Sequence, residues 1–227
     1  MPKNKKTKSI AFCPGCGHII ILQTLNRVLQ KLQKADRAAI GLDIGCSLLA
    51  WDMLPISTFQ THHGRAVPTM VGFEKAREKS IAVAYTGDGG AYSIGLQSLL
   101  WAARRNNPIL VIVVNNTIYG MTGGQTAPTS LRGQVTDTAP AGHDELPMLG
   151  PELVRELNGQ AYIARTAANE PVILAEYLER AIKATEAGNF ALVEVLSYCP
   201  TNWRMKGVES NNHLNKLKDT FKTGEIL

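Results

Sequence analysis

Acidic and amide side chains follow two apolar runs of the sequence. IAVAY (81–85) is followed by TGDGG, and ILVIVV (109–114) is followed by NNTIYG. Asp88 offers a carboxylate oxygen, Asn116 offers an amide oxygen and Ile118 offers a backbone carbonyl oxygen. Mg²⁺ prefers oxygen ligands in octahedral geometry and shares its coordination shell with phosphates and water. The two stretches together predict a Mg²⁺ site that holds an anionic ligand.

Glycines surround the predicted acidic ligand. Gly87, Gly89 and Gly90 would let the backbone approach a diphosphate closely. The N-terminus of the following helix would favour the negative charge of that group. GDG alone is more simply a strand-to-helix turn, but 25 intervening residues and a second motif, NN, favour a binding site. The rival phosphate motifs GxxxxGK[ST] and GxGxxG do not occur in these stretches.

Four cysteines form a second candidate site. Cys13 and Cys16 make a CxxC pair in FCPGCGH, Cys46 lies in DIGCS and Cys199 lies in SYCPTNW. They could be unrelated buried cysteines, four ligands of a structural zinc ion, or four ligands of a [4Fe-4S] cluster. The second CxxC of a zinc ribbon is missing, but spacing alone does not choose between iron and zinc.

The apolar pattern predicts the elements that would position these residues. Helical spacing predicts helices over 17–34, 64–77, 92–105 and 170–187. Continuous apolar runs predict strands over 39–45, 81–85, 109–114, 161–166 and 191–196. This alternation indicates an α/β fold, a mostly parallel sheet with helices on both faces. Ligands of such sheets bind at the carboxyl ends of the strands, where GDGG and NNTIYG lie. The long stretch 120–150, without a clear period, is expected to be a functional loop.

Length and composition fit a single domain. The 227 residues include 44% hydrophobic residues and carry a net charge of +5. We predict one domain over 1–227 with a basic N-terminal tail (1–9) and a helical C-terminal tail (about 204–227). The basic tail is a weak indicator of nucleic-acid binding, so no such partner is expected. Neither a signal peptide nor a membrane span is visible, which predicts a cytoplasmic protein without disulfides or a membrane partner.

Several sequence words, in this order, resemble a known family. They are FCPGCGH, DIGCS, HHGRA (62–66), GDGG, NNTIYGMTGGQTAPTS (115–130) and CPTNW (199–203). The chain resembles the beta, thiamine diphosphate-binding subunit of 2-oxoacid:ferredoxin oxidoreductases from about residue 11 to 203. Within that family it is most similar to the 2-oxoisovalerate (branched-chain) type, and the 2-oxoglutarate type is the near rival. GDGG stands where many relatives have GDGD, so its fourth residue is not diagnostic.

The resemblance implies the diphosphate-side fold of thiamine enzymes and a set of ligands. Mg²⁺ would be bound by Asp88, Asn116 and the Ile118 carbonyl, and a [4Fe-4S] cluster by Cys13, Cys16, Cys46 and Cys199. The residue types and the resemblance together give the expected cofactor-binding residues: Cys46, Ser47, His63, Gly64, Arg65, Gly87, Asp88, Gly89, Gly90, Asn116, Ile118 and Thr122. Ser47 could instead hydrogen-bond a sulfur of the cluster. Simpler roles stay open for several of them. Arg65 could be a solvated residue at a helix start, Thr122 a turn residue, and Tyr119 and Met121 either walls of the pocket or core. His18 is predicted to be structural.

The resemblance also implies a reaction and partners. The family oxidatively decarboxylates a 2-oxoacid to acyl-CoA and CO₂ and passes electrons through the cluster to ferredoxin. Thiamine enzymes need an activating glutamate from a pyrimidine-binding domain, which we expect on an alpha subunit, so this chain alone should be inactive. A ferredoxin-like subunit is a further expected partner. The alternatives are a non-redox thiamine decarboxylase with a structural metal, and a non-catalytic scaffold subunit.

Overall fold

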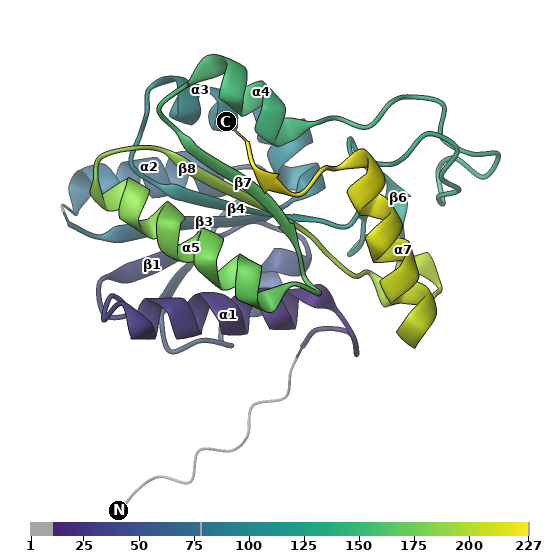
Figure 1. Ribbon diagram of the computed structural model, residues 1–227, viewed down its shortest axis with the longest axis horizontal. Helices are drawn as coiled ribbons and strands as arrows, with labels where there is room; N and C mark the ends of the chain where they lie inside the picture. Colours follow the sequence, from purple (N-terminus) through teal and green to yellow (C-terminus); the bar gives the residue numbers. More distant parts are fainter. Residues whose placement is uncertain (1–10, 78, 227) are drawn as a thin grey trace, which may run out of the picture.

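A seven-stranded sheet forms the centre of the computed structural model, which describes residues 11–77 and 79–226 (Figure 1). Its strand order is β2-β1-β3-β4-β8-β7-β9, and every neighbouring pair is parallel except the antiparallel pair β7 and β9. The bounds are β1 Ala38–Leu42, β2 Ser57–Gln60, β3 Ile81–Gly87, β4 Leu110–Asn115, β7 Tyr162–Ala167, β8 Ala191–Leu196 and β9 Gly224–Glu225. A separate antiparallel pair contains β5 Ile118–Tyr119 and β6 Gln125–Thr126. The predicted α/β class is confirmed.

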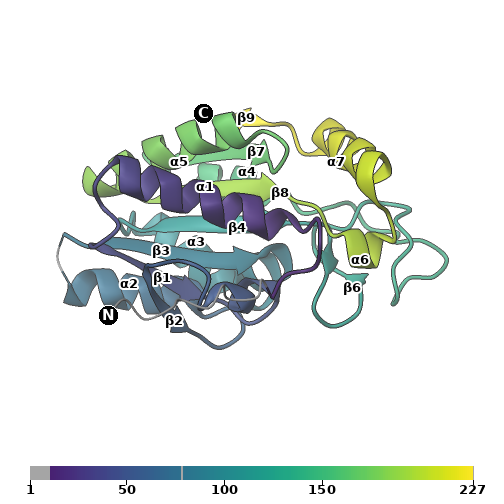
Figure 2. The same cartoon turned by 90° about the horizontal axis from the view of Figure 1, so that it is seen from below.

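Helices cover both faces of the sheet. They are α1 Gly17–Lys31, α2 Ala66–Ala76, α3 Leu96–Arg104, α4 Gly150–Leu157, α5 Pro171–Glu186, α6 Pro200–Trp203 and α7 Gly207–Thr220. Helices α1 and α5 lie side by side on one face, and α2, α3 and α4 pack on the other (Figures 1 and 2). Strand β4 is apolar on both faces because alternate residues enter the two cores. This explains why the sequence shows continuous rather than alternating apolar runs.

The structure places all five predicted strands and four predicted helices, with shifted ends. The helix expected over 92–105 begins at Leu96, because a π-helix, η2 Gly90–Ile94, occupies the preceding turn. The strand expected over 39–45 ends at Leu42, and a 3₁₀ helix, η1 Cys46–Ala50, follows. Six strands and α-helices of the described residues were not predicted, namely β2, β5, β6, α4, α6 and β9.

The C-terminal segment contributes to the sheet as well as to the surface. The predicted helical tail contains α7, which buries Leu214 and Leu217, and Phe221 directly follows in the same apolar cluster. The chain then forms β9, which pairs with β7 at the sheet edge. The predicted basic tail (1–9) lies outside the described residues. Among the helices of 11–77 and 79–226, none combines the length and apolar character that a membrane span requires.

Candidate cofactor and metal site

The carboxyl ends of β3 and β4 open into one cavity. The two strands are neighbours, and Gly87 at the end of β3 pairs in register with Val114. Ten of the twelve predicted cofactor-binding residues line this cavity: Cys46, Ser47, His63, Gly87, Asp88, Gly89, Gly90, Asn116, Ile118 and Thr122. Gly64 and Arg65 do not line it. The edge of the sheet therefore brings the two motifs together, as the parallel topology requires.

Asp88 is a buried carboxylate with hydrogen-bond donors but no cationic side chain in the described ion pairs. The Gly89 amide donates to its Oδ1 at 2.9 Å, and the Thr129 hydroxyl donates to its Oδ2. Burial raises the pKa of Asp88 to about 7, although Thr129, Gly89 and the Thr117 amide oppose this shift. A buried carboxylate without a paired charge is costly. A divalent cation would supply the missing charge, so the site fits Mg²⁺.

The turn after β4 presents further oxygens beside Asp88. Thr117 has φ 63°, a left-handed conformation that is uncommon for a β-branched residue. The Asn115 Oδ1 accepts a hydrogen bond from the Thr117 amide at 3.1 Å, and the Asn116 Oδ1 accepts one from the Ile118 amide at 3.2 Å. The Ser130 hydroxyl donates to the Thr117 carbonyl at 2.6 Å. Backbone strain held by such contacts is typical of functional sites.

Two glycines of the turn after β3 are required by close packing. A Cβ on Gly89 would clash with the ring of Tyr119, and a Cβ on Gly90 would clash with the Asp43 carboxylate. The π-helix η2 begins at Gly90, and π-turns are frequent at functional sites. Gly87, Gly89 and Gly90 also line the cavity, and glycine backbone at this position fits the close approach of a diphosphate.

Asp43 is a site residue that sequence reasoning missed. Its Oδ1 accepts hydrogen bonds from the amides of Gly64 at 2.7 Å and Ile44 at 2.9 Å, and its Oδ2 accepts one from the Thr86 hydroxyl at 2.7 Å. Burial raises the pKa of Asp43, and these hydrogen bonds oppose the shift. Asp43 thereby ties the HGR segment, at Gly64, to β3. The available signal was an acid inside the strand predicted over 39–45.

The remaining predicted residues differ in how they meet the cavity. His63 lines it, whereas the Arg65 guanidinium lies 3.4 Å from the carbonyl oxygens of Gly64 and Ile94. Thr122 is exposed at the rim and donates to the Gln125 side chain at 2.6 Å. His18 is buried 2.7 Å from the Tyr85 hydroxyl, and burial lowers its pKa to about 3, so its ring is neutral. These contacts fit a pocket role for His63 better than for Arg65.

The four cysteines are free and lie near one another. Cys16 precedes α1, Cys46 begins η1 and Cys199 precedes α6. Burial raises the pKa of the Cys16 thiol to about 12, and Cys46, Cys199 and Cys13 add to that shift electrostatically. A Cβ on Gly120 would lie 3.4 Å from the Cys46 Sγ and 3.5 Å from the Cys199 Sγ. The thiols therefore gather around the NNTIYG loop.

Hydrogen bonds join the Cys199 segment to the turn after β4. The Asn202 amide donates to the Gly120 carbonyl at 2.6 Å and lies 3.6 Å from the Cys199 Sγ. The Trp203 indole donates to the Asn116 carbonyl at 3.0 Å. Within the described part of the chain, no three His, Cys, Asp or Glu side chains are close enough to bind a single metal ion. The thiols are neighbours without forming a compact one-ion site.

The comparisons with known proteins agree with this arrangement. Residues 43–195 match the family described as thiamine pyrophosphate enzyme, C-terminal TPP binding domain. Fold and site therefore define a thiamine pyrophosphate-binding domain. The chain is 35% identical over 212 residues to the 2-oxoglutarate synthase subunit KorB of Archaeoglobus fulgidus, a match that covers 93% of this chain and 76% of that relative.

Two further similarities bear on the subfamily. The ketoisovalerate oxidoreductase subunit VorA of Methanothermobacter thermautotrophicus is 37% identical over 201 residues, or 85% of this chain and 42% of VorA. A solved 2-oxoglutarate:ferredoxin oxidoreductase from Magnetococcus marinus, with 2-oxoglutarate, coenzyme A and succinyl-CoA bound, has a TM-score of 0.83 and 30% identity. That match covers 93% of this chain and 71% of the solved chain. The chain belongs to the 2-oxoacid:ferredoxin oxidoreductase subunit family, and this confirms the family expected from its motifs.

Proposed function

We propose that this chain is the thiamine diphosphate-binding subunit of a 2-oxoacid:ferredoxin oxidoreductase that acylates coenzyme A. The observation that carries the proposal is the shared cavity of Asp88, Asn116 and Cys46, with Cys199 held nearby through Gly120. In the reaction, a 2-oxoacid carboxylate loses CO₂, its acyl group is joined to the sulfur of coenzyme A as the thiol proton is released, and two electrons pass to ferredoxin. Bound thiamine diphosphate would supply the carbanion chemistry for the carbon–carbon cleavage.

The chain's own oxygens would hold Mg²⁺ and the diphosphate. Asp88, the Asn116 amide oxygen and the Ile118 carbonyl are hard ligands that suit Mg²⁺. The backbone at Gly87, Gly89 and Gly90 and the ring of His63 would surround the cofactor, and the rim hydroxyl of Thr122 would donate to it. Ser47 is buried beside Cys46 on the same wall, and we assign it to the same pocket. Gly64 supports His63 through its bond to Asp43, while Arg65 would meet anions at the pocket edge.

We propose that Cys13, Cys16, Cys46 and Cys199 bind a [4Fe-4S] cluster beside this pocket. Burial keeps the Cys16 and Cys46 thiols protonated without a metal, since their pKa values rise to about 12 and about 11. Metal coordination would deprotonate them. A structural zinc ion would need its four thiolates around one ion, whereas a cluster presents four separate irons. The likeness to a solved 2-oxoglutarate:ferredoxin oxidoreductase supports the cluster, because ferredoxin takes part in electron transfer.

The rest of the active site would come from partners. Asp88 is the one acidic residue among the described residues that line the cavity, and the proposed Mg²⁺ uses it. The activating glutamate would therefore be supplied by an alpha subunit with a pyrimidine-binding domain. The match to VorA covers 42% of the length of that relative. A ferredoxin-like subunit and ferredoxin would take the electrons.

For the substrate, we propose a branched-chain 2-oxoacid. VorA, named for ketoisovalerate, is 37% identical to this chain. The second candidate is 2-oxoglutarate, favoured by the relative KorB at 35% identity and by the solved structure. Side-chain selection would depend on the partner chain that completes the pocket.

A substrate panel tests the proposal. The native complex, co-purified without oxygen, is supplied with 2-oxoisovalerate, 2-oxoglutarate or pyruvate, together with coenzyme A and an electron-accepting dye. We expect dye reduction and acyl-CoA, fastest with 2-oxoisovalerate, and no activity from the isolated chain. Aldehyde formed without any electron acceptor would instead identify a non-redox decarboxylase. A complex that fails to bind thiamine diphosphate would identify a scaffold subunit.

A further inference from the structure

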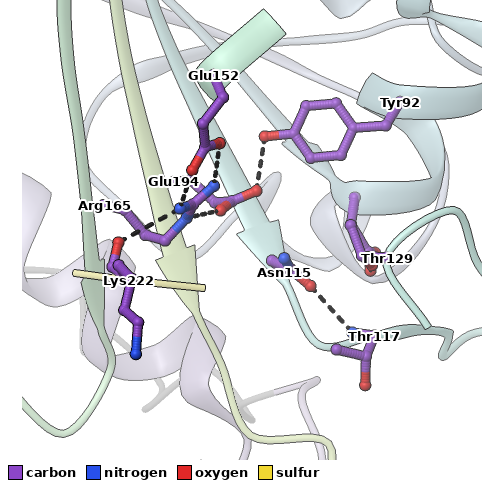
Figure 3. Close-up of polar contacts among 9 residues, drawn as sticks. Tyr92, Asn115, Thr117, Thr129, Glu152, Arg165, Glu194 and Lys222 are labelled. Carbon is purple, nitrogen blue, oxygen red and sulfur yellow. Dashed lines mark hydrogen bonds and ion pairs between the residues drawn. The ribbon is translucent and has the colours of Figure 1, made fainter. Parts of the chain in front are cut away.

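A buried charged cluster lies on the sheet face that α4 covers (Figure 3). Arg165 on β7 and Glu194 on β8 are register partners, and both are fully buried. The Arg165 Nε donates to the Glu194 Oε2, and its two terminal nitrogens donate to the two carboxylate oxygens of Glu152, each at 2.7 Å. The Lys222 carbonyl accepts a further bond at 3.3 Å. The Tyr92 hydroxyl donates to the remaining Glu194 oxygen, Oε1, at 2.7 Å.

Stability alone does not account for these charges. A buried ion pair is often no more stabilising than apolar residues of similar volume. Glu194 interrupts the apolar run ALVEVL of β8, and its register partner on β4 is Val113. An apolar residue at 194 would continue the core on this face. An apolar residue could not accept a hydrogen bond from the Tyr92 hydroxyl. The carboxylate of Glu194 does accept it, and this is the contact that an apolar replacement would lose.

Tyr92 connects the cluster to the turn that carries Asp88. It lies in the π-helix η2, which begins two residues after Asp88. A Cβ on Gly150 would clash with its ring, so the ring is held between the start of α4 and Glu194. Burial and the Glu194 carboxylate raise the pKa of Tyr92 well above its usual value, so its hydroxyl remains a donor. Gly90, at the other end of the turn, packs on Asp43.

We propose that Glu194, oriented by Arg165 and Glu152, is a positioning residue that fixes the GDGG turn through Tyr92. The inference rests on the proposed function, because it assigns the turn to Mg²⁺ and diphosphate binding. Glu194 and Tyr92 do not line the cavity. They act by holding the π-turn, and with it Asp88, in register with Asn116 before the ligand arrives. Preorganisation of this kind raises affinity by reducing the ordering cost of binding.

The test is a hydroxyl deletion with a matched control. Tyr92→Phe removes the bond to Glu194 and leaves the ring in place. Tyr162→Phe also removes a buried tyrosine hydroxyl, but at the amino end of β7, away from the turn. In the co-purified complex, the Kd for Mg²⁺ is measured at a fixed thiamine diphosphate concentration, alongside the urea midpoint. We expect Tyr92→Phe to raise that Kd about three- to tenfold, as one lost hydrogen bond would. Tyr162→Phe should leave it within about twofold.

The possible results separate the two claims. A wild-type complex that does not bind Mg²⁺ and thiamine diphosphate contradicts the proposed function and with it this inference. Wild-type binding with an unchanged Kd in Tyr92→Phe overturns the inference alone. An equal rise of the Kd in both variants also overturns the inference, because the loss of any buried tyrosine hydroxyl would then have the same effect on binding. Should Tyr92→Phe not fold, Glu194→Asp keeps the charge beside Arg165 but withdraws the acceptor from Tyr92. It should raise the Kd in the same way, and an unchanged Kd overturns the positioning role.

Discussion

The indole of Trp203 donates a hydrogen bond to the backbone carbonyl of Asn116 at 3.0 Å. The bond joins two segments that are distant in sequence, the residues after Cys199 and the turn that offers the proposed Mg²⁺ ligands. Asn202 makes a second connection, to the Gly120 carbonyl. These two bonds therefore link the segment after Cys199 directly to the turn after β4.

Removal of the Trp203 indole donor should lower both the free energy of unfolding and the affinity for Mg²⁺ and thiamine diphosphate. Trp203→Phe leaves the Asn116 carbonyl without this buried donor, which costs about 1–3 kcal/mol of the free energy of unfolding. The turn is also less constrained, so the Kd for Mg²⁺ and thiamine diphosphate should rise. Urea unfolding and calorimetric titration measure the two effects. Trp101→Phe, at an exposed tryptophan of α3, is the control. Equal behaviour of the two variants would contradict the role assigned to Trp203.

Asp88→Asn separates ligand binding from stability. The amide retains an acceptor oxygen but removes a negative charge that is buried without a cationic partner. We expect the Mg²⁺-dependent affinity for thiamine diphosphate to fall by at least about tenfold, or about 1.4 kcal/mol. The metal-free chain should unfold at an unchanged or higher urea concentration, because an unpaired buried charge is lost. Asp137→Asn, in an exposed loop, should change neither quantity. Full retained affinity in Asp88→Asn would refute its assignment as a Mg²⁺ ligand.

Asp43→Asn should lower the stability of the protein, because the Asp43 carboxylate holds the segment around His63 through the Gly64 amide. The carboxylate accepts three hydrogen bonds, from Ile44 and Gly64 at Oδ1 and from Thr86 at Oδ2, and an NH₂ group in place of Oδ2 cannot accept the bond from the Thr86 hydroxyl. One unsatisfied buried donor costs about 1–3 kcal/mol of stability. Urea unfolding compares this variant with Asp36→Asn, at an exposed position. A midpoint shift no larger than that of the control would show that the carboxylate is dispensable.

The contribution of the edge strand β9 to the stability of the fold should depend on pH. The Arg180 guanidinium donates a hydrogen bond to the Glu225 Oε1 at 2.9 Å, and this bond lowers the pKa of Glu225 below its ordinary 4.5. A lowered carboxyl pKa stabilises the fold above the unfolded-state pKa, and that contribution is lost as the pH falls through the folded-state pKa. Glu225→Gln should therefore lower the urea midpoint slightly at pH 7, and the difference should shrink below pH 4.5. Glu209→Gln, exposed on α7, is the control. A difference that grows in acid would contradict this assignment.

The sequence predicted those parts of the fold that depend on local patterns. Strands β3, β4 and β8 are buried on both faces, so their apolar runs were unambiguous. Strand β2 is short and mostly exposed, and β9 has two residues whose pairing depends on the finished sheet. Helix α4 had signals in Pro151 at its start and in its amphipathic pattern, but it has only 8 residues and follows a long stretch without a clear period. The π-turn depends on tertiary contacts of Gly90 and Tyr92, which no periodicity encodes.

The candidate site likewise contains residues that the sequence predicted and residues that it did not predict. Asp88, Asn116 and the four cysteines belong to motifs whose residue types carry the chemistry, so they were predicted. The groups that orient them, Asp43 and Thr129, belong to no motif. Their roles arise only when separate segments meet, as when the Thr129 hydroxyl reaches Asp88 across 41 residues of sequence. Glu194 and Arg165 were visible as charged residues within predicted strands, but neither gave an indication of its partners.

The central claim is that the thiols hold a redox cluster beside the thiamine pocket, and metal analysis of the native complex tests it most directly. Protein purified without oxygen should contain about four irons for this chain's cluster, as four thiolate ligands require. A ferredoxin-like subunit would add further irons to the complex. The iron content of the Cys13→Ala complex is therefore subtracted from that of the wild-type complex, and the difference should be about four irons. Stoichiometric zinc without iron, or iron content unchanged by Cys13→Ala, would contradict the account.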